Sequence, residues 1–155
     1  MFERDEAKLA KRIAKMVGEL IGRETTLKAV PAANRTVVAA AGGTFGADGV
    51  KTTIRVEADL ACAALLGAAL AMIPSGRVQD VVKSGKLDAD LSENTQEIFN
   101  VMTRALAMDG SIRARLRKFD VLDPKGAKPA KHDMAWDLSV AGYGAGRLAL
   151  TFKTT

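Results

Sequence analysis

Four polar residues in the second half of the chain have the spacing of one helix face. They are Glu93, Glu97, Asn100 and Arg104. At about 100° per residue they fall within roughly 60° of one another, so a helix over residues 90–108 would present them as one polar ridge. The carboxamide of Asn100 can donate to and accept from a water molecule without titrating, and the Glu97 carboxylate can pair with a cation. The pattern predicts a polar helix face that is presented outward.

The same helix carries an apolar side that can anchor it in a core. The residues on that side are Leu91, Ile98, Val101, Met102 and Ala105. Asp90 and Glu93 have the spacing of a capping box, which gives Glu93 a structural alternative to a functional role. Glu-x-x-Asn is also common by chance, so the alternative for Glu97 and Asn100 is that they are solvated helix residues.

The first half of the chain is predicted to supply a helix and part of a sheet. Apolar residues recur at three- and four-residue intervals from Leu9 to Ile21, which is typical of an amphipathic helix. Three β-type segments follow, at about 25–30, 35–41 and 50–57. Segment 42–49 is rich in glycine and leads into a strand rather than a helix. We therefore interpret it as a hairpin loop and not as a phosphate-binding loop.

The middle and the end of the chain are predicted to add helices and then strands. A hydrophobic, alanine-rich helix is expected between the cap Asp59 and the breaker Pro74. Segment 75–89 is looser and should hold one helical turn before the helix of the ridge. Alternation with a period of two returns at Ser111, where it predicts a strand, and again over residues 134–152, where it predicts a hairpin.

These elements follow the order helix, three strands, two helices, three strands. The glycine-bearing turns at 41–49 and 141–146 both join alternating strands, so a weak internal pseudo-repeat is plausible. We predict an α/β fold of the α+β kind, in which helices pack on antiparallel sheet. No linker divides the chain, so one pseudo-symmetric domain over residues 1–155 is expected.

The composition disfavours disulfide and metal chemistry. The chain has 155 residues and 48% hydrophobic content, which is enough for a core without disulfides. Its only cysteine, Cys62, lies in an apolar run and is predicted to be a buried thiol. One histidine and one cysteine leave few ligands for a metal, so no cofactor of its own is expected. The histidine, His132, lies in a lysine-rich loop and is predicted to be exposed.

The charge pattern and the apolar stretches disfavour nucleic acid and membrane as partners. The net charge of +5 comes from 23 basic and 18 acidic residues that are interspersed. A basic stripe at Arg113, Arg115, Arg117 and Lys118 lacks stacking aromatics, so a solvated sheet face explains it better than a nucleic-acid site. The longest apolar stretch is shorter than the roughly 18 residues of a membrane span, and no secretory signal is visible. We therefore expect a soluble, cytoplasmic protein.

The residues around the ridge also form a family pattern. The chain reads Glu93-Asn94-Thr95-Gln96-Glu97-Ile98-Phe99-Asn100, and Pro124 comes after twenty-three intervening residues. This resembles the active helix of the CheC, CheX and FliY chemotaxis phosphatases, which carries Asp or Ser, three residues, Glu, two residues, Asn, and a Pro after twenty-two more. The element order is similar to CheX, which carries one such helix where CheC and FliY usually carry two. Residues 65–72, taken as the second position, hold no such motif.

The resemblance implies a function as well as a fold. A CheX-like protein dephosphorylates a phosphorylated response regulator of the CheY type, and Asn100 would orient the attacking water in the regulator's phosphoaspartate site. Glu97 would pair with the regulator's active-site lysine, and Glu93, Gln96 and Arg104 are expected to contact the partner. The magnesium ion would belong to the regulator.

The resemblance leaves the assembly and one rival function to be settled. CheX-like relatives suggest a homodimer, which would also cover open sheet edges. The rival function is a non-catalytic signalling scaffold of the same fold. Such a scaffold would bind a partner, or another copy of itself, through the ridge or a sheet edge.

Overall fold

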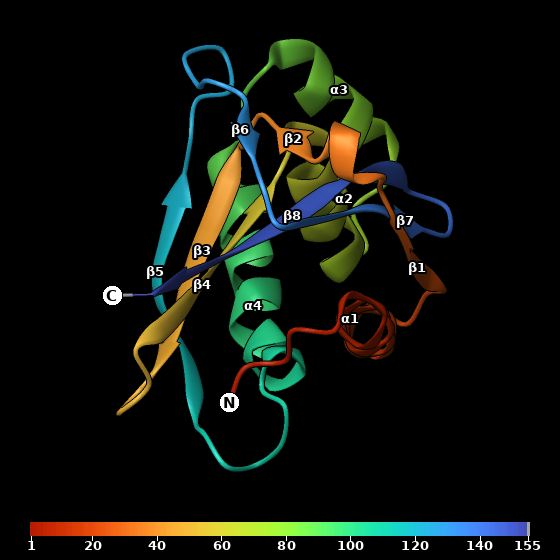
Figure 1. The fold of residues 1–155 in the computed structure, drawn as a ribbon. Helices are drawn as coiled ribbons and strands as arrows, with labels where there is room; N and C mark the ends of the chain where they lie inside the picture. Colours follow the sequence, from red (N-terminus) through yellow and green to blue (C-terminus); the bar gives the residue numbers. More distant parts are fainter. Residues whose placement is uncertain (155) are drawn as a thin grey trace.

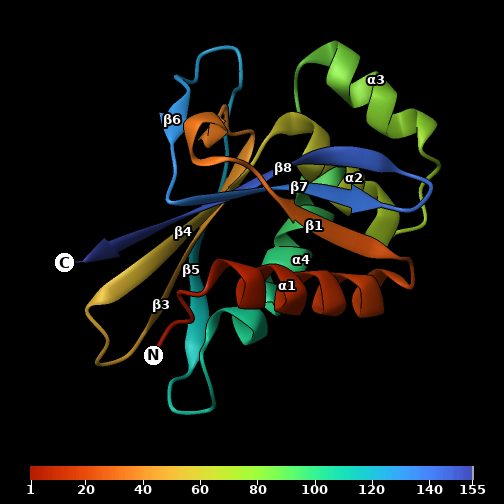
Figure 2. The same cartoon turned by 45° about the vertical axis from the view of Figure 1, so that its right-hand side comes forward.

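Six antiparallel strands form the central sheet, and helices α1, α2 and α4 pack on one of its faces (Figures 1 and 2). The computed structural model describes residues 1–154. The helices are α1 (Glu6–Ile21), α2 (Leu60–Leu70), α3 (Gly76–Ser84) and α4 (Ala89–Leu106), with a 3-10 helix at Ala32–Asn34. The strands are β1 (Thr25–Ala29), β2 (Thr36–Val37), β3 (Ala41–Ala47), β4 (Thr52–Ala58), β5 (Ala114–Val121), β6 (Ala130–Lys131), β7 (Met134–Val140) and β8 (Gly144–Thr154). The order across the sheet is β1-β7-β8-β4-β3-β5.

The main core lies between the sheet and these helices. Alternate residues of the strands point into it, among them Ile54 and Val56 of β4 and Trp136 and Leu138 of β7. A smaller cluster of Val30, Val37, Ala135 and Ala149 is buried apart from the main core. Val37 belongs to the two-stranded ribbon that β2 forms with β6. No helix within residues 1–154 combines the length and the apolar character needed to cross a membrane.

Most of the predicted elements are present. The N-terminal amphipathic helix is α1, and the final hairpin is β7 with β8. The Asp59 side chain caps α2 as predicted, accepting a hydrogen bond from the backbone N–H of Cys62 at 2.8 Å. The predicted buried thiol of Cys62 is confirmed, and burial raises its pKa well above the ordinary value. Segment 75–89 holds more than one helical turn, because α3 has nine residues.

The predicted hairpin loop at 42–49 is wrong, since most of this segment forms strand β3. An added Cβ at Gly43 would lie 2.7 Å from a ring carbon of Phe99 in α4, and one at Gly46 would lie 2.6 Å from the Arg117 guanidinium. The glycines therefore make room for side chains that cross the strand from other elements. The predicted strand at 35–41 is reduced to the short β2, and β3 begins only at Ala41.

The sheet order gives physical content to the predicted pseudo-repeat. Strands β8 and β4 are central, β7 and β3 flank them, and β1 and β5 are outermost. In each half a helix precedes an edge strand and then a hairpin: α1, β1 and β3–β4, then α4, β5 and β7–β8. The counterpart of α4 is therefore α1 and not residues 65–72, which lie mainly in α2. The interpretation of residues 65–72 as the position of the second motif-bearing helix is therefore wrong.

Candidate functional site

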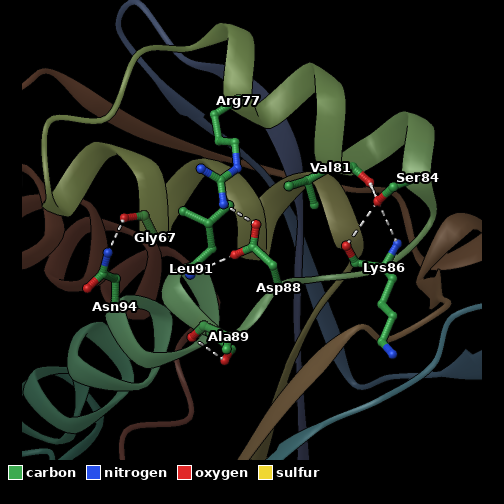
Figure 3. A network of polar contacts seen from close by, with 10 residues as sticks. Gly67, Arg77, Val81, Ser84, Lys86, Asp88, Ala89, Leu91 and Asn94 are labelled. Carbon is green, nitrogen blue, oxygen red and sulfur yellow. Dashed lines mark hydrogen bonds and ion pairs between the residues drawn. The ribbon is translucent and has the colours of Figure 1, made fainter.

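Helix α4 begins at a well-formed N-terminal cap (Figure 3). The Asp88 side chain accepts a hydrogen bond from the backbone N–H of Leu91 at 3.0 Å and pairs with Arg77 of α3. Partial burial would raise the pKa of Asp88, but the bonds from Leu91 and Arg77 outweigh it and hold this pKa below the ordinary value. The predicted capping box is therefore wrong, because Asp88 is the cap and Asp90 lies in the first turn.

Polar contacts fix α4 against α2. The Thr95 hydroxyl is buried and lies 2.8 Å from the carbonyl oxygen of Ala63 in α2 and 2.8 Å from that of Leu91 in its own helix. The Asn94 side chain donates to the carbonyl oxygen of Gly67 at 3.1 Å, as Figure 3 shows. An added Cβ at Gly67 would lie only 2.4 Å from the carbonyl oxygen of Leu91. The two helices are thus in close backbone contact.

Apolar contacts fix α4 against the sheet. The buried ring of Phe99 meets Phe119 of β5 edge-to-face, with centroids 5.3 Å apart, and stacks near Phe45 of β3 at 6.4 Å. Ile98 and Met102 are also fully buried. These residues fix which side of α4 packs against the sheet, so the opposite side of the helix must face outward.

The four predicted ridge residues and Gln96, the further residue expected to contact a partner, are all exposed on that outward side. They are Glu93, Gln96, Glu97, Asn100 and Arg104. Within residues 1–154, none of their side chains has a hydrogen bond or ion pair. Glu93 is therefore not a capping residue, since its carboxylate contacts no backbone N–H. The arrangement leaves a carboxylate and a carboxamide one turn apart on a rigid helix, free to bind groups of a partner.

Basic residues gather at the C-terminal end of the ridge. Arg104 borders two surface hollows of about 470 and 290 Å³, and Arg12 of α1 lines both. The Arg12 guanidinium donates to the C-cap carbonyl oxygen of α4, Ala107, at 2.7 Å and to the following carbonyl oxygen, of Met108, at 3.2 Å. It also lies 3.5 Å from the Glu3 carboxylate. Acidic residues precede Asn100 on the ridge, and Arg104 follows it. Arg12 was not singled out from the sequence, because only the packing of α1 against α4 gives it this role.

The basic stripe on β5 is partly neutralised. Arg115 and Arg117 lie 3.2 and 3.8 Å from the Asp48 carboxylate, and Lys118 lies 3.7 Å from Asp120. The ladder between β3 and β5 shifts register after Thr44, which breaks the simple alternation expected for this strand. Ion pairs along an exposed strand fit the solvated sheet face that the sequence favoured. The absence of a nucleic-acid partner stays a prediction.

The prediction of an exposed His132 is wrong. Its side chain is buried, and Nε2 lies 2.7 Å from a carboxylate oxygen of Glu57 on β4. The hydrogen bond with His132 holds the pKa of Glu57 below its ordinary value, although burial opposes this shift. The ribbon of β2 and β6 lies next to His132, and the backbone N–H of His132 donates a hydrogen bond to the carbonyl oxygen of Arg35. The local sequence, a lysine-rich loop, carries no signal for that contact.

Pro124 lies in the turn after β5, and its neighbour Lys125 is close to Gly85 at the end of α3. The structure thus places the proline near α3. Within residues 1–154, no group of three or more His, Cys, Asp and Glu side chains is arranged to hold a metal ion.

Several solved structures share this fold, whereas no protein-family model and no curated protein sequence matches the chain. The FliM middle domain from Vibrio alginolyticus aligns with a TM-score of 0.59 at 9% identity, over 96% of this chain and 89% of that one. The chemotaxis protein CheX from Desulfovibrio desulfuricans aligns with a TM-score of 0.56 at 12% identity, over 95% and 97%. A chain of the CheX-CheY-BeF3-Mg²⁺ complex from Borrelia burgdorferi gives 0.53 at 9% identity, over 97% and 99%.

These structures establish the fold of the protein. It is the α+β fold shared by CheX and the FliM middle domain, so the predicted fold class and the resemblance to CheX in fold are confirmed. At 9–12% identity the likeness does not extend to the roles of single residues.

Proposed function

We propose that this protein binds a phosphorylated response regulator of the CheY type and hydrolyses its aspartyl phosphate. The observation that carries the proposal is the exposed ridge of α4, on which Glu97 and Asn100 have no partner within residues 1–154. The fold supports it, because a Borrelia burgdorferi chain of the same fold was crystallised in a complex with CheY, BeF3 and Mg²⁺.

The proposed mechanism is positioning of a water molecule. Asn100 accepts a hydrogen bond from the water and donates one to the phosphoryl group, which places the water oxygen in line with the bond to be broken. That oxygen bonds to phosphorus, the bond between phosphorus and the aspartate oxygen breaks, and inorganic phosphate leaves. The displaced aspartate keeps the bonding electron pair, and the proton lost by the water goes to the phosphate. The magnesium ion is the regulator's own and neutralises charge on the phosphoryl oxygens.

The other ridge residues would dock the helix. Glu97 forms an ion pair with the regulator's active-site lysine. This ion pair determines how far Asn100 enters the regulator's acidic pocket. Glu93, Gln96 and Arg104 lie around Glu97 and Asn100 and contact the regulator's surface at the edge of that pocket. The anchoring of α4 by Thr95 and Phe99 means that the helix enters as a preformed element, with little ordering cost on binding.

A non-catalytic scaffold of the same fold is the second candidate. The specific observation in its favour is Arg104, whose exposed guanidinium follows Asn100 by one turn and would stand close to an incoming partner. The similarity to the FliM middle domain is compatible with this candidate. A scaffold would bind the regulator through the ridge without shortening the lifetime of its phosphoaspartate.

Phosphoaspartate decay on purified regulators separates the two candidates. The protein is added at a concentration well below that of the phosphorylated regulator, with magnesium present, and released phosphate is followed over time. Turnover of several regulator molecules per protein molecule is expected. Binding to the regulator with an unchanged decay rate would establish the scaffold instead.

A further inference from the structure

Strand β1 forms one edge of the sheet and pairs with another strand on one side only, whereas β5 forms the opposite edge (Figure 2). Glu24 accepts a hydrogen bond from Ala141 N–H, and Val30 N–H donates to the Ala135 carbonyl, both at 2.9 Å. Even-numbered residues of this segment therefore direct their backbone groups toward β7. The N–H and C=O groups of Thr25, Leu27 and Ala29 point the other way, and within residues 1–154 none of them has a partner.

A groove of about 820 Å³ runs along this edge between β1 and α1. The helix contributes the small side chains of Ala7, Ala10 and Ala14, which leave space beside β1. Trp136 of β7 also lines it, fully buried, and its indole Nε1 has no hydrogen-bond acceptor within residues 1–154. The Trp136 ring therefore forms part of the apolar wall of the groove.

Two carboxylates and two ammonium groups line the groove, and within residues 1–154 the carboxylates already have partners. Asp5 is used as the cap of α1, and Glu6 pairs with Arg35 at 3.1 Å. Lys11 and Lys28 also line the groove, and their ammonium groups have no partner in the part of the chain that the structure describes. The groove therefore favours an acidic occupant.

Self-pairing of this edge is disfavoured by the same charges. In an antiparallel pair of β1 strands centred on Leu27, Lys28 would lie diagonally across from Lys28 of the second copy, at about 7–8 Å on the same face. Like charges at that separation are destabilising. An acidic strand of another protein would instead place carboxylates next to these lysines.

We propose that the β1 edge binds an extended, acidic segment of a partner protein as a seventh strand of the sheet. The backbone of that segment pairs with Thr25, Leu27 and Ala29. Its inward side chains enter the groove against the alanines of α1 and the ring of Trp136. Its outward carboxylates lie near Lys28. The site uses none of the ridge residues of α4, so it does not depend on the proposed phosphatase activity.

Tryptophan fluorescence tests this directly, because Trp136 is the only tryptophan of the chain. The probe is a blocked peptide, Glu-Val-Glu-Thr-Glu-Val-Glu, titrated into the full chain at low salt. A saturable change in emission is expected. A peptide of the same sequence with alternate backbone N-methyl groups should bind at least about tenfold more weakly, which corresponds to about 1.4 kcal/mol.

Two variants and one control place the peptide on the edge. Ala29→Pro removes an outward N–H and leaves the bonds to β7 intact, and Lys28→Glu reverses a rim charge. Each should weaken binding about tenfold or more, whereas Lys83→Glu on the exposed side of α3 should not. Equal binding by Ala29→Pro or by the N-methylated peptide, or no emission change at millimolar peptide, overturns the proposal. A dimer that Ala29→Pro converts to monomer would also overturn it, in favour of a second copy as the occupant.

Discussion

The hydrogen bond between Glu57 and His132 makes a pH-dependent contribution to stability. The pKa of Glu57 is held below its ordinary value, so its contribution is fully present above the unfolded-state pKa and is lost as the pH falls through the folded-state pKa. Glu57→Gln should cost about 1 kcal/mol of unfolding free energy near neutral pH. The difference from the wild type should narrow below about pH 4.

Urea unfolding between pH 7 and pH 3 measures that difference. Glu19→Gln, at an exposed glutamate of α1, serves as the control and should change stability little at either end. A Glu57→Gln deficit that stays constant down to pH 3 would show that the ionised Glu57 carboxylate, with its partners His132 and Arg55, is not the source of the stabilisation.

In the proposed mechanism Glu97 binds the regulator and does not position the attacking water. Because its side chain is exposed and makes no hydrogen bond or ion pair within residues 1–154, Glu97→Ala should alter the unfolding free energy by no more than about 0.5 kcal/mol. The regulator concentration for half-maximal rate should rise several-fold, while the maximal rate changes much less. Initial rates over a range of regulator concentrations provide the measurement. Glu24→Ala removes the same charge outside the ridge and should leave both parameters unchanged.

At the scale of elements, the close contact between α2 and α4 is what fixes the orientation of the ridge. A Cβ at Gly67 would meet the Leu91 carbonyl oxygen at 2.4 Å, and backbone atoms of a packed helix cannot move aside cheaply. Gly67→Ala should therefore reduce the unfolding free energy by about 1–3 kcal/mol in urea titrations. Gly76→Ala is the matched control, since a Cβ there meets nothing within 4 Å. It should be neutral or slightly stabilising, and equal losses in the two variants would refute this account of the contact.

The elements also show what the sequence could predict. The ridge of α4 and the helix α1 followed from a strong 3.6-residue period, because both helices bury one side and expose the other. Strand β3 could not be predicted in this way. Its glycines disfavour a strand locally, and only the rings and guanidinium groups that cross it from α4, β4 and β5 explain them. The burial of His132 likewise depends on Glu57, a residue 75 positions away.

At the scale of the whole molecule, the pairing of the outer strands explains why the sequence predicts a pseudo-repeat but not the helix that corresponds to α4. Each half lends its edge strand to the other half: β1 pairs with β7, and β5 pairs with β3. No local pattern encodes this exchange, so α1 could not be recognised as the counterpart of α4. The exposed position of the ridge was predictable, whereas its basic surroundings required the packing of α1 beside α4.

A homodimer remains a prediction at this scale. Strand β5, at the end of the sheet opposite to β1, is also unpaired, and an open edge favours association. Sedimentation at high micromolar concentration should show a dimer. A monomer under those conditions would contradict the prediction without bearing on the ridge.

The central claim is that Asn100 positions the attacking water, and one kinetic comparison tests it most directly. Phosphate release from a saturating phosphorylated regulator is measured for the wild type, for Asn100→Ala and for Gln79→Ala, which removes an exposed carboxamide from α3. Asn100→Ala should remain folded, within about 0.5 kcal/mol of the wild type, and release phosphate roughly ten- to a thousandfold more slowly. Gln79→Ala should match the wild type. If folded Asn100→Ala dephosphorylates every cognate regulator as fast as the wild type does, the proposed mechanism is wrong.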